Sequence, residues 1–308
     1  MRRREFIEKT AATTAFLGLG LTLSGFKSQE IGNGKIKHLT ILHTNDVHSY
    51  IDAFPSNHPK NPNMGGVARR ATLIESIRKE NPNVLLLDAG DIFQGTPYFN
   101  YYGGELEFKL MSMMGYDAAT LGNHDFDNGI DGFNAQLPHA TFNFVSANYN
   151  FKNTVLDGIV KPYSIFHKDG IKVGVFGLGI KLEGLVDKKH YKETVYNDPV
   201  TVSQDIVRIL KHEKKCDLVI CLSHLGYKYK DDTDKICDLT LAKLTQDIDL
   251  IIGGHTHTFL DKPTVVKNAV DQDVLINQVG CYGLNLGRID FYFDYDASKV
   301  ISGKSIII

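Results

Sequence analysis

The chain has 308 residues, of which 43% are hydrophobic and 23% are charged, and its formal net charge is −2. This hydrophobic content is enough for one sizeable core or two small ones, and the moderate charged content excludes a wholly disordered chain. The slightly acidic balance argues against binding to a nucleic acid polymer, because proteins that do so carry a basic surplus.

The first thirty residues have the pattern of an export signal. Three basic residues, Arg2–Arg4, precede small and apolar residues from Ala11 to Leu23, and Arg3-Arg4-x-Phe6-Ile7 is typical of a twin-arginine signal. We therefore predict a signal peptide over residues 1–30 and an exported chain, in the bacterial periplasm. The apolar stretch is too short for a membrane span, so the mature chain should have none, and an uncleaved N-terminal anchor is the alternative.

From residue 36 onward, short apolar runs alternate with amphipathic stretches, the pattern of an α/β fold. Strands are expected at 38–43, 84–87, 118–121, 171–177, 218–222 and 250–252, and helices at 67–79, 106–114 and 200–212. The tail over 274–308 is rich in strand-forming residues, with turns expected at Gly283, Gly287 and Gly303, and it suggests a second, mixed sheet. Since no linker-like segment interrupts the pattern, one domain over 36–308 is the simplest interpretation.

Five of the predicted strands are followed by clusters of Asp, Asn and His. The clusters are Asn45-Asp46-Val47-His48, Asp88-Ala89-Gly90-Asp91, Gly122-Asn123-His124-Asp125-Phe126-Asp127, Ser223-His224 and Gly253-Gly254-His255-Thr256-His257. Sites in α/β sheets assemble at the carboxyl ends of strands, so the five clusters could meet in one place. Each cluster alone is more often a solvated loop or a turn. Together, their imidazoles and carboxylates predict a site for divalent zinc, manganese or iron.

The order of these clusters resembles that of the calcineurin-like metallophosphoesterase superfamily. Longer strings resemble its 5′-nucleotidase branch: Leu42-His43-Thr44-Asn45-Asp46, Gly65-Gly66-Val67-Ala68-Arg69, Leu87-Asp88-Ala89-Gly90-Asp91, Gly95-Thr96-Pro97 and Gly122-Asn123-His124-Asp125-Phe126-Asp127. The resemblance implies a catalytic domain with a four-layer α/β/β/α sandwich, in which two mixed sheets are flanked by helices.

The resemblance also implies a centre of two divalent metal ions. Asp46, His48 and His257 would hold one ion, Asn123, His224 and His255 the other, and Asp91 would bridge both. A hydroxide between the ions would attack phosphorus in line. His124 would stabilise the developing charge or protonate the leaving oxygen, and Asp127 would orient it. Asn45 and Asp88 would support the ligands by hydrogen bonds. The alternatives are a structural or ligand role for His124 and a helix-capping role for Asp127.

The implied function is hydrolysis of phosphate monoesters, with 5′-nucleotides as the favoured substrates. A 2′,3′-cyclic nucleotide phosphodiesterase or a nucleotide-sugar pyrophosphatase could share the same metal core. A different class is a non-catalytic, metal-containing subunit that binds nucleotides. A bare metal-storage or structural protein ranks last, because it gives no role to His124 and Asp127.

Two features depart from the family pattern. Full-length members carry a C-terminal domain that holds the nucleoside, and this sequence shows no such region. Either a separate chain supplies that domain, or this domain acts alone on simpler esters. The smaller departure is Ser49, which follows His48 where the family commonly has Gly.

Overall fold

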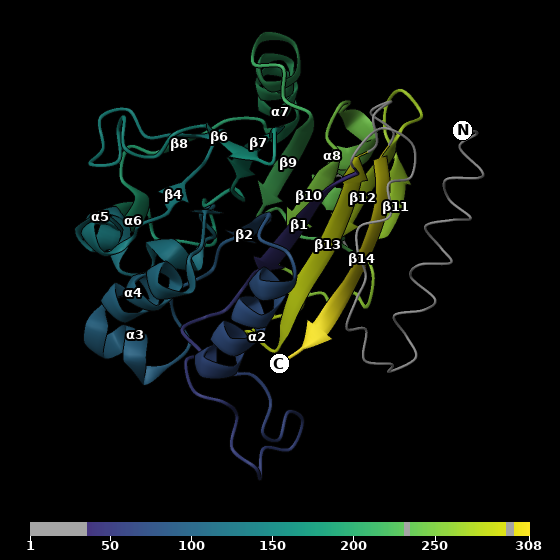
Figure 1. The fold of residues 1–308 in the computed structure, drawn as a ribbon. Helices are drawn as coiled ribbons and strands as arrows, with labels where there is room; N and C mark the ends of the chain where they lie inside the picture. Colours follow the sequence, from purple (N-terminus) through teal and green to yellow (C-terminus); the bar gives the residue numbers. More distant parts are fainter. Residues whose placement is uncertain (1–35, 231–234, 294–298) are drawn as a thin grey trace, which may run out of the picture.

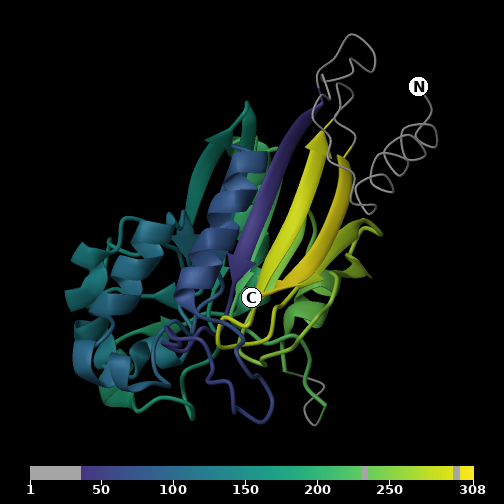
Figure 2. The same ribbon diagram turned by 60° about the horizontal axis from the view of Figure 1, so that its bottom comes forward.

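Two six-stranded sheets lie face to face, and helices cover the outer face of each (Figures 1 and 2). The structure, a computed structural model, describes residues 36–230, 235–293 and 299–308, so the predicted signal peptide over 1–30 lies outside the described residues. The arrangement confirms the expected four-layer α/β/β/α sandwich of two mixed sheets.

The first sheet has the strand order β14-β13-β1-β2-β3-β4. Its strands are β1 (Lys37–Thr44), β2 (Val84–Asp88), β3 (Ala118–Ala119), β4 (Asn143–Phe144), β13 (Asn285–Phe293) and β14 (Lys299–Ile307). β1 to β4 run parallel, whereas β13 pairs antiparallel with both β1 and β14. The carboxyl ends of β1, β2 and β3 therefore lie at the same edge of the sheet.

The second sheet has the order β11-β12-β10-β9-β7-β6. Its strands are β6 (Tyr163–Lys168), β7 (Ile171–Leu178), β9 (Leu218–Ser223), β10 (Leu250–Gly253), β11 (Thr264–Lys267) and β12 (Asp273–Asn277). The four central strands run parallel, and the two edge strands run antiparallel to their neighbours. β5 (Tyr149–Asn150) and β8 (Val195–Tyr196) form a separate two-stranded sheet.

The helices divide between the two outer faces. The elements are α2 (Val67–Glu80), α3 (Pro97–Tyr102), α4 (Glu105–Met114), η1 (His124–Phe126), α5 (Gly129–Gln136), η2 (Leu137–His139), α6 (Lys188–Tyr191), α7 (Pro199–Arg208), η3 (Ile209–Glu213) and α8 (Asp238–Leu244). Side chains of α2, α4 and α5 pack on the first sheet, and those of α7 and α8 pack on the second. Within the described residues, no helix is long and apolar enough to cross a membrane.

The hydrophobic core between the sheets explains the continuous apolar runs in the sequence. Side chains of a strand alternate between its two faces, so Ile41 faces the second sheet whereas Leu42 faces the helices. Leu85 and Leu86 in β2 alternate in the same way. Because both faces of these central strands are covered, every residue of β2 is buried.

Three expectations about secondary structure were wrong in detail. The strand expected at 118–121 covers only Ala118–Ala119, and the helix expected at 200–212 changes to π-helix over Ile209–Glu213. Gly287 and Gly303 lie inside β13 and β14 rather than in turns. At each position a close neighbour excludes a side chain: a Cβ would lie 2.0 Å from Nε2 of His43 at Gly287, and 2.6 Å from Cγ of Pro263 at Gly303.

Candidate metal centre

The turns that follow β1, β2, β3, β9 and β10 meet where the edges of the two sheets adjoin. Each turn carries one of the five clusters of Asp, Asn and His. The structure brings together the side chains of all seven residues that the sequence suggested as metal ligands: Asp46, His48, Asp91, Asn123, His224, His255 and His257. Segments more than 200 residues apart in the sequence thus form one cluster.

Three of the seven side chains form a first group, Asp46, His48 and His257. One potential ligand atom from each lies within 4.8 Å of the others. Nε2 of His257 lies 3.4 Å from Oδ1 of Asp46 and 3.0 Å from Nε2 of His48. Two imidazole nitrogens and a carboxylate oxygen that face a common point are a suitable donor set for a divalent cation.

A second group contains Asp91, His224 and His255, again with one ligand atom from each within 4.8 Å of the others. Nε2 of His224 lies 3.0 Å from Oδ2 of Asp91. The amide oxygen of Asn123 lies 2.8 Å from Nδ1 of His255, which places Asn123 beside this second group.

Asp91 belongs to the second group and also lies close to the first. Its Oδ1 accepts a hydrogen bond from the backbone N–H of His124, at 2.8 Å. Its Oδ2 is 3.0 Å from Nε2 of His224 in the second group and 3.8 Å from Nε2 of His48 in the first. One carboxylate oxygen therefore faces a histidine from each group, which is the position that a shared ligand requires.

The backbone of these turns is unusual. Asp46, His48, Asp91, His255 and His257 all have positive φ angles, between 49° and 72°. Few residues other than glycine adopt this left-handed region, and such strain clusters at functional sites. Backbone hydrogen bonds from Asp46 N to Gly90 O (2.9 Å) and from His48 N to Asp91 O (3.0 Å) fasten the first turn to the second.

Carbonyl oxygens fix the orientation of two of the imidazoles. Nδ1 of His48 lies 3.2 Å from the carbonyl oxygen of Phe93, and Nδ1 of His224 lies 2.7 Å from that of Ala89. Because a carbonyl oxygen only accepts, each Nδ1 carries the hydrogen, and in the neutral ring Nε2 is left to face the cluster with its lone pair. This outer hydrogen bond is typical of histidines that bind metals.

The two residues expected to support the ligands differ in what they contact. Asn45 donates from Nδ2 to Oδ2 of Asp46 (2.6 Å) and accepts from the backbone N–H of Val279 (2.9 Å). Asp88 instead accepts hydrogen bonds from the hydroxyl of Thr44 (2.6 Å) and from the N–H of Gly90 (2.8 Å). It thus shapes the turn before Asp91 without touching a ligand side chain.

The structure also shows a residue that the sequence analysis missed, Asp125. Its carboxylate is fully buried and accepts four backbone hydrogen bonds: from Gly122 (2.8 Å), Asp91 (3.0 Å), Ile92 (2.9 Å) and Phe93 (3.2 Å). Burial, together with the nearby charge of Asp91, raises the pKa of Asp125 to about 7. Asp125 therefore ties the turn of Asp91 to the turn that carries Asn123.

These two turns touch so closely that Gly122 has no room for a side chain. A Cβ there would lie 2.1 Å from Oδ1 of Asp91 and 2.5 Å from its backbone nitrogen. Because one of these neighbours is backbone, the contact could not relax cheaply, and glycine is required at this position.

His124 and Asp127 form a pair at the rim of the cluster. Nδ1 of His124 lies 2.8 Å from Oδ2 of Asp127, and the two side chains are 37% and 31% exposed. The hydrogen bond to Asp127 is the main reason why the pKa of His124 is raised. Because the pair is partly exposed, a ligand can reach it from solvent. Because its pKa is raised, the His124 ring can hold a proton at this position.

The charge balance of the cluster favours cations. In the part of the chain that the structure describes, the ion pairs of the buried Asp46 and Asp91 all involve histidines. Burial alone would lower the pKa of His224 and His257. Asp91 instead raises the pKa of His224 to about 10. Asp46 together with Cys281 raises the pKa of His257 to about 10. The two carboxylates thus favour positive charge next to them, and without divalent ions this charge comes from protons on His224 and His257.

One buried atom supports the same conclusion. Nε2 of His224 is close to Asp91, yet it lacks the alignment of a hydrogen bond with any described residue. In the neutral ring that metal binding requires, the lone pair of this buried nitrogen is unsatisfied, and a bound cation removes that cost. The residues present therefore fit a pair of divalent metal ions.

Comparison with known proteins agrees with this geometry. The calcineurin-like phosphoesterase family matches residues 39–259, so the chain belongs to that family and to its class of metal-dependent phosphoric ester hydrolases. The family implies divalent metal ions.

The chain is similar to several nucleotide-hydrolysing proteins. It is 36% identical over 288 residues to the trifunctional nucleotide phosphoesterase protein YfkN of Bacillus subtilis, a match that covers 83% of this chain and 18% of that protein. It is 34% identical over 300 residues to a snake venom 5′-nucleotidase of Gloydius brevicauda, covering 88% of this chain and 48% of that protein. The chain thus spans half the length of these relatives or less.

A solved structure gives the same result. The 5′-nucleotidase precursor of Thermus thermophilus superimposes with a TM-score of 0.79 at 32% sequence identity, covering 88% of this chain and 55% of that one.

Proposed function

We propose that this protein is a metal-dependent nucleotide phosphoesterase whose preferred substrates are 5′-nucleotides. The observation that carries the proposal is the pair of ligand groups that share Asp91. The similarity to 5′-nucleotidases over more than four-fifths of the chain supports the choice of substrate class.

In this proposal the two groups hold two divalent ions. Asp46, His48 and His257 hold one, Asn123, His224 and His255 hold the other, and Asp91 is shared. When bound, such ions supply positive charge for the phosphate oxygens and a water nucleophile with a lowered pKa. The donor set of imidazole, carboxylate and one amide suits zinc, manganese or iron.

His124 is the residue proposed to act on the ester itself. It lies outside both ligand groups, with its ring centroid 5.3 Å from that of His48. Its Nδ1 faces Asp127, so its Nε2 remains for the substrate. The raised pKa keeps a proton available there for the leaving oxygen, and Asp127 fixes the orientation of the ring.

Hydrolysis assays test the substrate class. The purified chain, with Mn²⁺ or Zn²⁺, would be offered AMP, a 2′,3′-cyclic nucleotide and a UDP-sugar. The proposal expects release of phosphate from AMP at the highest kcat/KM and loss of turnover on addition of EDTA. Preference for either of the other two substrates would favour a phosphodiesterase or a pyrophosphatase. Binding of nucleotide without turnover of any ester would favour a non-catalytic subunit.

Export and a catalytic domain that acts alone complete the proposal. Export from the cell, with a signal over residues 1–30 and a catalytic domain over 36–308, is compatible with similarity to venom enzymes. A separate chain that supplies nucleotide binding finds no support in the matches. The simpler proposal is that the described residues carry the chemistry themselves.

A further inference from the structure

Ser49, which follows His48 directly, is buried in a conformation that suits glycine. Its φ angle is 59° and its residue surface is 1% exposed. A serine in the left-handed region is unfavourable unless its surroundings hold it there. Ser49 is not one of the proposed metal ligands, so metal binding alone does not explain this unfavourable backbone conformation.

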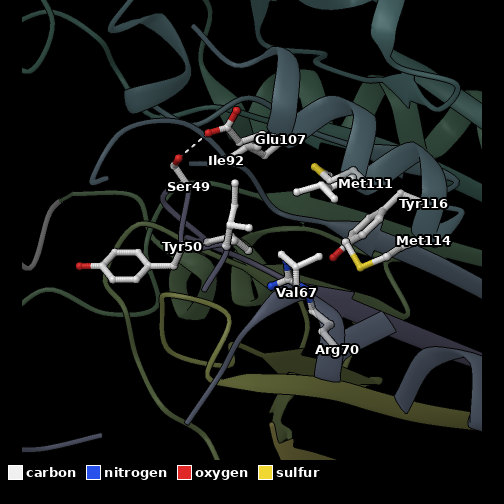
Figure 3. Close-up of a pocket in the computed structure, with 12 residues that line it drawn as sticks. Ser49, Tyr50, Val67, Arg70, Ile92, Glu107, Met111, Met114 and Tyr116 are labelled. Carbon is white, nitrogen blue, oxygen red and sulfur yellow. Dashed lines mark hydrogen bonds between the residues drawn. The ribbon is translucent and has the colours of Figure 1, made fainter. Parts of the chain in front are cut away.

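The side chain of Ser49 contacts both Thr96, whose Oγ1 lies 2.9 Å from the Ser49 hydroxyl oxygen, and helix α4. The Ser49 hydroxyl donates a hydrogen bond to Oε1 of Glu107, a contact drawn as a dashed line in Figure 3. Glu107 is 5% exposed, and its other oxygen, Oε2, has no hydrogen-bond partner among the described residues. Burying a carboxyl group is costly, and burial raises the pKa of Glu107. The hydrogen bond from Ser49 satisfies one of the two oxygens of this buried carboxyl group.

The backbone of Ser49 joins the two turns that carry the proposed ligands. Its N–H donates to the carbonyl oxygen of Ile92 at 2.8 Å, one residue beyond Asp91. Its carbonyl oxygen accepts from the hydroxyl of Thr96 at 2.9 Å. Through Glu107, these turns are thus attached to α4, which lies in the hydrophobic core through Phe108 and Met111.

Figure 3 shows where this attachment lies. Ser49 and Glu107 line a cavity of about 20 Å³, whose other walls are mostly apolar, such as Ile92 and Met111, but include Arg70. A cavity of this size has room for about one water molecule, and because Ser49 and Glu107 are both buried, little solvent reaches the hydrogen bond. A water-excluded hydrogen bond holds its geometry more firmly than an exposed one.

We propose that Glu107 and Ser49 are positioning residues for the first ligand group, because their hydrogen bond fixes the turn that aims Asp46 and His48. Neither residue belongs to the two ligand groups. The inference rests on the proposed metal-dependent function, but it concerns the affinity for metal and is tested apart from turnover. Partners one step beyond the ligands typically change metal affinity by about 10–100-fold.

Four variants separate positioning from stability. Ser49→Gly removes the hydroxyl while relieving the left-handed backbone, so it should fold. Glu107→Leu removes the acceptor, whereas Glu107→Gln keeps it. Ser203→Ala is the matched control, since that buried hydroxyl donates to the carbonyl oxygen of Pro199 (2.6 Å) in α7, on the far sheet.

The experiment is a Mn²⁺ titration of each metal-free protein by calorimetry, with thermal unfolding in EDTA measured in parallel. We expect Ser49→Gly and Glu107→Leu to weaken one of two Mn²⁺ equivalents by about 10-fold or more, with Glu107→Gln and Ser203→Ala near wild type. Wild-type affinity for both equivalents in Ser49→Gly and Glu107→Leu would overturn the proposal, even if their unfolding temperatures fell. Absence of Mn²⁺ binding by the wild type would overturn it as well.

The outcome is distinguishable from failure of the proposed function. If the wild type binds two equivalents of Mn²⁺ but hydrolyses no nucleotide, the catalytic proposal fails. The titrations of the variants would still decide the positioning role.

Discussion

The buried carboxylate of Asp125 should be one of the most important groups for the stability of this protein. The substitution Asp125→Ala leaves the N–H groups of Gly122, Asp91, Ile92 and Phe93 without their acceptor. Each lost hydrogen bond of this kind costs about 1 kcal/mol at the lower end of the usual range, so we expect a total loss of about 4 kcal/mol. That is a large fraction of the stability of a typical domain.

Urea unfolding of the metal-free protein, followed by circular dichroism, measures this loss directly. Asp125→Asn keeps one oxygen and should lose less, about 2 kcal/mol, since two N–H groups keep an acceptor. Asp157→Ala is the control, because Asp157 is exposed, and it should change the free energy of unfolding by no more than about 0.5 kcal/mol. If the free energy of unfolding of Asp125→Ala lay within about 1 kcal/mol of the wild-type value, the four hydrogen bonds would contribute less to stability than we predict.

Three further substitutions test the site and the fold. His124→Ala should lower kcat for AMP by about 10²–10⁴-fold while both metal ions stay bound, as metal analysis would show; loss of a metal would mean that His124 is a ligand instead. Asp91→Asn should weaken both Mn²⁺ equivalents together in a titration, and a fully loaded pair would contradict a shared ligand. Asp290 is largely buried, which would raise its pKa, but hydrogen bonds from His38, Arg288 and Thr40 outweigh burial and lower the pKa to about 2. Because the pKa is lower in the folded than in the unfolded state, where it is about 4, the ionised carboxylate stabilises the fold at pH values above about 4. The free energy of unfolding of the wild type should then exceed that of Asp290→Asn by about 2 kcal/mol. In denaturant titrations this difference should shrink as the pH falls from about 4 towards about 2. A difference independent of pH would show that the charge of Asp290 contributes nothing.

Much of the fold was predictable because its local signals agree with its tertiary structure. Central strands such as β2 are covered on both faces, so they appear in the sequence as continuous apolar runs. The stop of helix α4 was also predictable, since Gly115 ends it with a φ of 71°. The two glycines wrongly assigned to turns, Gly287 and Gly303, are instead explained by neighbours that are remote in sequence.

The residues of the candidate site could be predicted from the sequence, but the hydrogen bonds that hold their turns in place could not. Polar clusters after parallel strands indicate convergence, and the structure does bring Asp46, Asn123 and His224 into one cluster. Asp125 lies within a recognisable motif, yet its partners at positions 91–93 lie more than thirty residues away. Ser49 departs from the family pattern in the sequence, but its hydrogen bond to Glu107 depends on how α4 packs. Such contacts are set by tertiary structure, and no local pattern encodes them.

The most direct test of the account is a crystal structure of the Mn²⁺-loaded protein, with anomalous scattering used to locate the ions. We predict two manganese peaks, one beside Asp46, His48 and His257 and one beside Asn123, His224 and His255, with Asp91 bound to both. A single peak, or two peaks that do not share Asp91, would contradict this prediction.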